Sequence, residues 1–271
     1  MSKRNSQASK SAARERLRAE RERQAKKDKV RRQVIVGLSI VGVLAVVGAG
    51  TWGIMQMNKP SHWEAAKDEK KVTAPKNTSG ENGTTVVIGK SSAKKTLELY
   101  EDSRCPVCAT FEQAIGETVH KDVDAGKYKI KYIGATFIDN ASNGEGSKNA
   151  LSALGAALDV SPEAFLDYKY ALYSAKFHPE ETVDKFKDDS YLIKVADSVD
   201  ALKGNAAFQK NVKDGTFDSW AMKMSETFDK SGVRGTPTLK MDGKKLTDGQ
   251  SENAPMTLEA FNTAITAALK G

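Results

Sequence analysis

The stretch EDSRCPVCAT (residues 101–110) contains both cysteines of the 271-residue chain, Cys105 and Cys108, with only Pro106 and Val107 between them. Two thiols at this spacing have three common uses in proteins. They form a structural disulfide, supply half of a metal site, or act as a dithiol that opens and closes during a reaction. The rest of the sequence bears differently on each of these uses.

A structural disulfide or a metal site fits the sequence poorly. A loop of four residues gains only about 2 kcal/mol from closure, against about 3 kcal/mol for a loop of about 15 residues. A structural zinc needs four ligands, but the chain has no third cysteine, and His62, His120 and His178 stand far apart. These histidines are typical of surface or capping positions, so we predict no metal site and no cofactor. A two-coordinate Cu(I) site stays open on soft-ligand grounds.

The residues around Cys105 favour a reactive thiol. A strand ends at Tyr100, a short polar turn follows, and a helix begins at or near Cys105. Unpaired backbone N–H groups and the helix dipole stabilise an anion at that position. A lowered pKa makes a cysteine the attacking thiolate, and Arg104 beside it would add to the effect. Pro106 is tolerated in a first helical turn, and Cys108, one turn later, can resolve a mixed disulfide.

The hydrophobic pattern on both sides of this stretch predicts an α/β fold. The predicted elements up to residue 138 are strands at 84–89 and 96–100, a helix at 105–120 and a strand at 127–138. A long block of helical pattern follows, in which Ser161-Pro162-Glu163 is a helix start. Strands then return around the hairpin signal Asp242-Gly243, and a last helix covers 256–269. This order predicts an α/β core with an all-helical insertion at about 145–232.

Two motifs give the chain a family resemblance. LELYEDSRCPVCATFEQ (97–113), together with GVRGTPTLKMDGK (232–244), resembles the DsbA-type thioredoxin-fold thiol-disulfide oxidoreductases, particularly their membrane-anchored bacterial forms. The resemblance covers about residues 82–270, including the insertion. It implies a thioredoxin-like fold and exchange of disulfides through a mixed disulfide with a substrate polypeptide.

The resemblance also implies roles for individual residues. Cys105 would be the surface-exposed catalytic sulfur, and Cys108 the buried catalytic sulfur that resolves the mixed disulfide. Pro237 would be a cis proline lying against the dithiol, and Thr236 before it would pair with the backbone of the substrate. Pro106 and Val107, between the cysteines, would also contact substrate.

The match departs from the family pattern in two places. The dipeptide between the cysteines is Pro-Val where the best-known oxidases carry Pro-His, and valine offers no hydrogen bond to a thiolate. Many relatives bury a carboxylate six residues before the first cysteine, where this chain has Leu99. Strand alternation places Glu101 on the same face as Leu99, and Glu98 and Asp102 on the other. No proton acceptor is assigned, and oxidase, reductase and isomerase activities all stay open.

The basic charge of the chain is confined to its amino-terminal end. Residues 1–32 hold 13 Lys/Arg and 4 Asp/Glu, a balance of +9, whereas the whole chain has a net charge of +7. The uncharged stretch 34–57 follows directly, and its 24 residues would reach about 36 Å as a helix, enough to span a bilayer. We therefore predict a basic cytoplasmic tail (1–33) and a single transmembrane helix (34–57) that contacts membrane lipid. The tail lacks interleaved aromatic residues, so we predict no nucleic-acid binding.

The flanking charges predict the orientation. Eight Lys/Arg lie in residues 18–32 and four in 58–72, so the amino terminus is expected in the cytoplasm and the rest outside. A cleaved signal peptide is the alternative. Residues 58–83 are polar and rich in Pro and Gly, which predicts a linker to a domain at 84–271, with Trp63 at the outer membrane interface.

These features predict a membrane-anchored, extracytoplasmic thiol-disulfide oxidoreductase. The expected activity is disulfide formation in exported polypeptides, with a quinone-linked membrane thiol oxidase re-forming the disulfide between the two cysteines. A reductase or isomerase for a dedicated client is an alternative within the same class. A membrane-tethered binding or chaperone module without catalysis is an alternative from another class.

Overall fold

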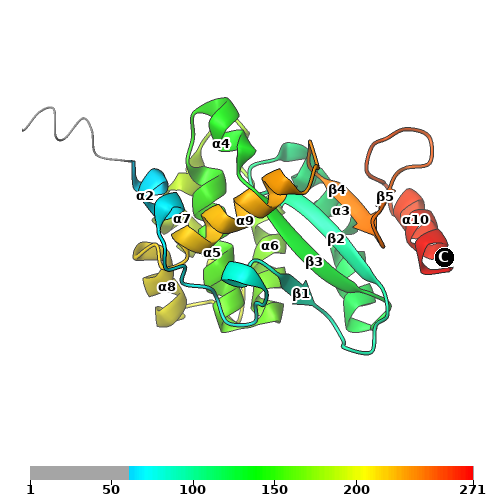
Figure 1. Cartoon of the computed structure of the whole chain (residues 1–271), viewed down its shortest axis with the longest axis horizontal. Helices are drawn as coiled ribbons and strands as arrows, with labels where there is room; N and C mark the ends of the chain where they lie inside the picture. The colour runs from blue at the N-terminus through cyan, green and yellow to red at the C-terminus, as the bar shows by residue number, and fades with distance from the viewer. Residues whose placement is uncertain (1–60, 271) are drawn as a thin grey trace, which may run out of the picture. The chain divides into compact units, whose positions relative to one another are not determined.

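The computed structural model describes residues 61–270 and contains one five-stranded mixed sheet (Figure 1). Its strands are β1 (Val86–Ile88), β2 (Thr96–Asp102), β3 (Lys129–Ala135), β4 (Thr238–Met241) and β5 (Lys244–Leu246). The strand order is β1-β3-β2-β4-β5, with β2 and β3 parallel and the other pairs antiparallel. The hairpin predicted at Asp242-Gly243 is confirmed as the β4–β5 connection, and the dithiol follows the central strand β2.

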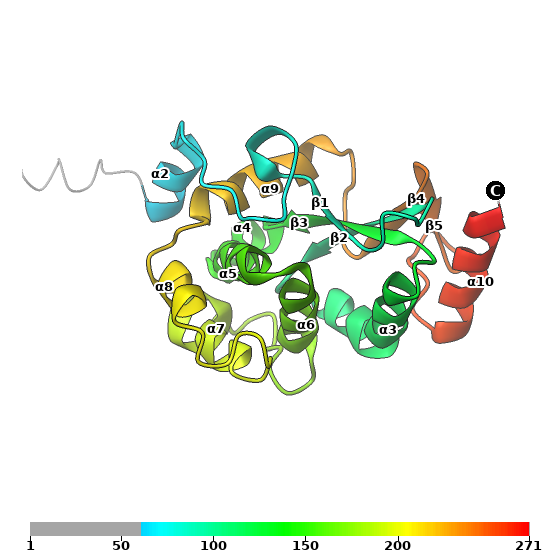
Figure 2. The ribbon, with the colours of Figure 1, turned by 90° about the horizontal axis from the view of Figure 1, so that it is seen from below.

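Helices cover both faces of this sheet (Figure 2). On one face lie α3 (Pro106–Asp124) and α10 (Leu258–Lys270), which touch through an edge-to-face contact of the Phe111 and Phe261 rings at 6.1 Å. On the other face lies α9 (Asp218–Lys230), whose Phe228 packs edge-on against Tyr100 of β2 at 6.3 Å. Residues on both faces of β2 are buried, among them Leu99, Tyr100 and Glu101, as expected of a strand in a sheet covered on two sides.

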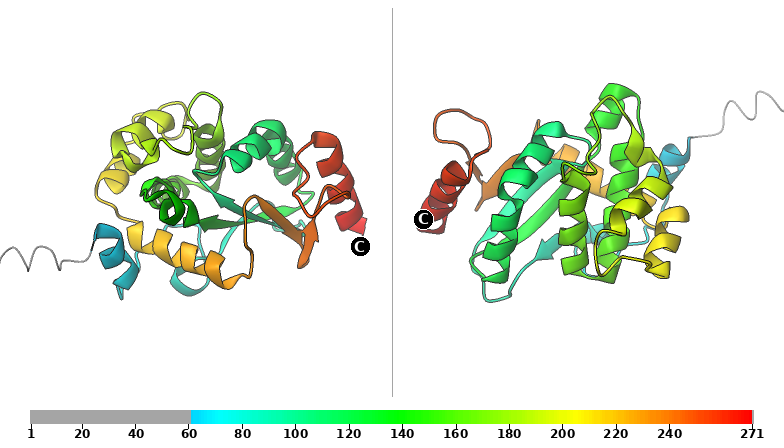
Figure 3. Two further views of the ribbon diagram at one scale, coloured as in Figure 1. Left: turned by 90° about the horizontal axis from the view of Figure 1, so that it is seen from above. Right: turned by 180° about the vertical axis from the view of Figure 1, so that it is seen from behind.

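The segment between β3 and β4 is helical, and most of it stands at one end of the sheet (Figure 3). Its elements before α9 are α4 (Phe137–Ser142), α5 (Gly146–Val160), α6 (Pro162–Tyr173), η2 (Lys185–Lys187), α7 (Asp189–Ala196) and α8 (Ala206–Lys213). Ser161 caps α6 by accepting a hydrogen bond from the Ala164 amide, as its sequence predicted. The strand expected to reach residue 138 instead ends at Ala135, because α4 begins two residues later.

The expected linker at 58–83 is wrong for residues 61–83, which are folded onto the domain. Helix α2 (His62–Asp68) lies beside α9 (Figure 1), and the His62 Nε2 is 2.6 Å from the Asp218 carboxylate. Trp63 is buried in this contact rather than free to reach a membrane interface. Further along, a short 3₁₀ turn, η1 (Glu81–Gly83), receives a hydrogen bond from the Trp220 indole at 2.9 Å. Burial of two indole rings outweighs the polar composition of this segment.

The predicted transmembrane helix at 34–57 lies outside the described residues. Within residues 61–270, the structure contains no helix with the length and apolarity needed to cross a bilayer. The basic tail at 1–33 also lies outside this part of the chain.

Candidate active site

The two cysteines lie at the junction of β2 and α3. Cys105 is the N-cap of α3, and its sulfur accepts a hydrogen bond from the Cys108 amide at 3.3 Å. Pro106 occupies the first helical turn, where its missing N–H costs nothing. Both cysteines are free thiols. The sequence therefore predicted the helix start correctly, and a sulfur replaces the oxygen that usually caps a helix.

The loop before β4 covers the first sulfur. The Thr236–Pro237 peptide bond is cis, as the family resemblance implied. The Cys105 thiol lies 3.5 Å from the Thr236 carbonyl oxygen, to which it donates a hydrogen bond. Because of this cover, Cys105 is only 5% exposed, and the expectation of a surface-exposed sulfur is wrong. Solvent does reach the side chain of Val107, between the cysteines, which is 49% exposed.

The environment separates the pKa values of the two thiols. Hydrogen bonding lowers the pKa of Cys105 to about 6, first through the Cys108 thiol and then through the Thr236 side chain and the Val107 and Cys108 amides, while burial opposes the shift. Burial raises the pKa of Cys108 well above its usual value, and the neighbouring Cys105 and Glu101 charges raise it further. Cys105 is thus the thiolate near neutral pH, and Cys108 the protonated thiol.

Behind the dithiol lies a buried group of three charged side chains. The ammonium of Lys169 on α6 is 3.1 Å from the Glu101 carboxylate of β2 and 2.5 Å from the Glu112 carboxylate of α3. All three side chains are at most 2% exposed. Burial raises the pKa of Glu101 to about 7, with Lys169 acting against the shift and Glu112 and Cys105 adding to it. Glu101 can therefore gain or lose a proton near neutral pH.

A second buried network holds the turn before Cys105. The Asp102 carboxylate accepts hydrogen bonds from the Arg104 amide at 3.0 Å and the Ser147 hydroxyl at 2.6 Å. The Arg104 guanidinium turns away from the sulfur and pairs with Asp139 at 2.9 Å and Asp184 at 3.3 Å. The expectation that Arg104 assists the thiolate directly is therefore wrong; it ties the turn to the helical insertion instead.

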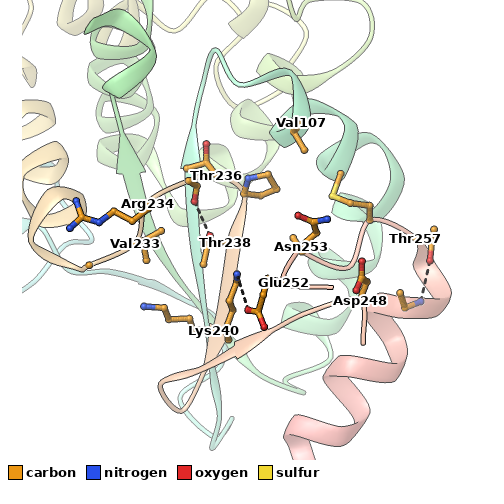
Figure 4. Close-up of a pocket in the computed structure, with 17 residues that line it drawn as sticks. Val107, Val233, Arg234, Thr236, Thr238, Lys240, Asp248, Glu252, Asn253 and Thr257 are labelled. Atoms are coloured by element: carbon orange, nitrogen blue, oxygen red, sulfur yellow. Dashed lines mark hydrogen bonds and ion pairs between the residues drawn. The ribbon is translucent and has the colours of Figure 1, made fainter. Parts of the chain in front are cut away.

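A groove of about 810 Å³ opens beside the dithiol (Figure 4). Val107 stands at one wall, Thr236 and Pro237 form another, and the loop containing Asn253 closes the far side. The structure thus brings together the residues that the sequence singled out. Val107, Thr236 and Pro237 line the groove, whereas the buried Cys105 and Cys108 and the exposed Pro106 are not part of its wall.

Sequence reasoning missed the buried charges at 101, 112 and 169. Glu101 gave one signal, since it is an acidic residue on the buried face of a strand that ends beside the cysteines. Glu112 lies seven residues after Cys105 on the buried side of α3, a weaker signal. Lys169 gave none, because only the packing of α6 against α3 brings it close.

A thioredoxin family model matches residues 81–267. The chain belongs to that family. The disulfide bond formation protein D of Bacillus subtilis is 26% identical over 161 residues, which are 59% of this chain and 68% of that protein. The crystal structure of oxidised DsbA from Mycobacterium tuberculosis superposes with a TM-score of 0.56 at 26% identity, covering 69% of this chain and 93% of that one.

A third relative shares the domain in another setting. The serine/threonine-protein kinase PknE of Mycobacterium tuberculosis is 26% identical over 171 residues, which are 61% of this chain but 30% of the kinase. The likeness is therefore confined to part of that protein. Together with the fold, the first two relatives confirm the prediction of a DsbA-like thioredoxin fold, and the chain is a thiol-disulfide oxidoreductase.

Proposed function

We propose that the chain forms disulfide bonds in exported polypeptides through Cys105 and Cys108. The observation that carries this proposal is the position of the Cys105 sulfur at the start of α3, within hydrogen-bond distance of the Cys108 amide and of the Thr236 carbonyl before the cis Pro237, beside an open groove. These contacts agree with the lowered pKa of Cys105. A stabilised thiolate favours the reduced form of the dithiol, which makes its disulfide a stronger oxidant. The names of the Bacillus and mycobacterial relatives support the same direction.

The reaction proceeds in two exchanges. A client thiolate attacks the Cys105 sulfur of the disulfide, so that a client–Cys105 bond forms, the bond to Cys108 breaks, and Cys108 takes a proton as it leaves. The second client thiol then loses its proton and attacks the client sulfur of the mixed disulfide, and Cys105 leaves as the stabilised thiolate. Two electrons pass from the client to the dithiol. A low pKa makes Cys105 the better leaving group in the second exchange.

The groove residues would hold the client during these steps. Thr236 presents its carbonyl next to the reacting sulfur, where it can pair with an extended client backbone. Pro237 and the exposed Val107 would pack against the client side chains near its cysteine. Pro106, exposed at the start of α3, would flank the same site.

We further propose that this chemistry takes place outside the cell membrane. The charge asymmetry around residues 34–57 supports a single anchor with the domain on the extracytoplasmic side. Reoxidation of Cys105 and Cys108 then requires an electron acceptor, for which a quinone-linked membrane thiol oxidase is the expected partner.

The direction of exchange is tested by equilibrating the protein with glutathione buffers. A potential near about −120 mV supports an oxidase, and one near about −270 mV supports a reductase. A Cys105→Ser variant should lose oxidation of a reduced client peptide while keeping its circular dichroism spectrum. If wild type and variant oxidise the peptide equally, the domain is a binding module and the catalytic proposal is refuted.

A further inference from the structure

Two unpartnered polar atoms face each other inside the domain, away from the substrate groove. They are Oε1 of Glu112 and Nε2 of His120, 3.9 Å apart. Both atoms are buried and neither has a hydrogen-bond partner within the part of the chain that the structure describes. A buried polar atom without a partner is costly. A small rotation of either side chain, or one water, would join this pair.

The two residues belong to a row along α3. Cys108, Glu112, Gly116 and His120 follow one another at intervals of four residues, so they lie on one side of the helix. Gly116 leaves the space through which Glu112 and His120 meet. A Cβ atom at that position would lie 2.9 Å from Cδ and 3.0 Å from Oε1 of Glu112. The glycine thus clears the line between the two groups.

The inner end of this row is connected to the dithiol. Lys169 bridges Glu112 and Glu101 through contacts of 2.5 and 3.1 Å. Glu101 is electrostatically coupled to both Cys105 and Cys108. Titratable groups therefore extend from the dithiol to Glu112: the charges of Glu101 and the thiols act on one another, and Lys169 contacts both carboxylates.

The outer end opens to solvent. The His120 side chain is 20% exposed and lines a hollow of about 510 Å³ between α3, α6 and the segment after α7. In Figure 2, α3 and α6 lie next to each other on the same side of the sheet. The hollow shares no residue with the groove beside Thr236. A client in that groove would leave this exit open.

We propose that His120 is the solvent outlet of a proton path that runs from Cys108 through Glu101, Lys169 and Glu112. This inference rests on the proposed function. When Cys108 attacks a mixed disulfide on Cys105, its proton passes to Glu101. The Lys169 ammonium gives a proton to Glu112 and receives one from Glu101, and Glu112 passes a proton to neutral His120. One proton thus leaves through the hollow, and no electron moves along the path.

The groups around His120 are consistent with a neutral, proton-accepting ring. Glu112 and Asp124 face it from α3, and Lys169 and Asp167 face it from α6. The Tyr170 ring lies 5.9 Å from the imidazole. Burial, more than any of these charges, lowers the pKa of His120, which favours the neutral ring and makes a protonated ring release its proton readily.

The test is single-turnover reaction of the reduced protein with oxidised glutathione, followed by acid quench and mass spectrometry. The first step forms the Cys105–glutathione mixed disulfide and needs no proton path. The second step, attack by Cys108, should be slowed about tenfold in His120→Ala at about pH 7. Added imidazole, which fits the open hollow, should restore it. The equilibrium constant with glutathione should change less than about twofold, because His120 is neutral before and after the reaction.

Further variants separate the relay from a structural role. Gly116→Ala and Glu112→Gln should slow the second step without rescue by imidazole, because they interrupt the path before its outlet. His62→Ala, which removes an imidazole elsewhere, should react as wild type. An unchanged second step in His120→Ala, or a slowed one that imidazole does not restore, overturns the proposal. Failure of wild type to form any mixed disulfide would instead refute the proposed function.

Discussion

The hydrogen bond between the two thiols can be removed by Cys108→Ala. The pKa of Cys105 lies at about 6, three units below its ordinary value of 9.0. Three units correspond to about 4 kcal/mol in favour of the thiolate. The Cys108 thiol is the largest cause of this shift, and a hydrogen bond to a charged group contributes about 1.5–3 kcal/mol. Its removal should therefore raise the pKa by about one to two units, to about 7–8.

The measurement is the ultraviolet absorbance of the thiolate as a function of pH, checked by the rate of alkylation. The chain has two cysteines, so Cys108→Ala leaves a single titrating thiol and an unambiguous signal. Cys108→Ser is the matched control, since its hydroxyl can still donate and should keep the pKa of Cys105 nearer to about 6. If the midpoint in Cys108→Ala stays at about 6, the backbone amides alone stabilise the thiolate. If wild type ionises only near 9, the reasoning fails altogether.

Three further perturbations test other parts of the site and fold. The pKa of Glu101 is raised from 4.5 to about 7. Its protonated form therefore contributes to the free energy of unfolding below pH 4.5, and this contribution should be lost as the pH rises to about 7. Urea unfolding of Glu101→Gln should not show this loss. Arg104→Ala removes from the buried Asp139 its closest cation, which should lower the free energy of unfolding by about 3–5 kcal/mol in urea titrations, with an unchanged slope. Trp63→Ala should destabilise the packing of α2 on the domain by about 3 kcal/mol. Residues 61–83 should then be cleaved more readily in limited proteolysis, and equal protease resistance in variant and wild type would contradict the packing described above.

Local signals in the sequence predicted most of the elements. The Asp242-Gly243 turn, the Ser161 cap and the start of α3 at Cys105 each depend on a few neighbouring residues, and all three are found in the structure. Residues 61–83 were misassigned because their packing depends on distant partners. The Trp63 and Trp220 rings stabilise that segment through contacts with parts of the chain about 140 residues or more away.

The same distinction applies to the candidate site. Cys105 and Pro237 could be picked out because each belongs to a short motif, although the sequence did not reveal that the second motif covers the first sulfur. The electrostatic partners could not be identified, because Lys169 reaches Glu101 from the helical insertion. Arg104 was misread for a related reason, since its nearest neighbour in sequence is Cys105 but its partner in space is Asp139.

The position of Glu101 links the protonation of the site to its redox state. Relatives that bury a carboxylate six residues before the first cysteine hold it at the position of Leu99 in this chain. Glu101 lies on the same face of β2, two residues and about 7 Å further along the strand. There the carboxyl group is influenced by the Cys105 charge, which raises the pKa of Glu101, and Glu101 in turn raises the pKa of Cys108. Oxidation of the dithiol removes the thiolate charge and thus one cause of the raised pKa, so Glu101 holds its proton less tightly in the disulfide form. Reduction reverses this change and favours proton uptake at Glu101. The influence of the Cys105 charge on Glu101 therefore links proton release to disulfide formation.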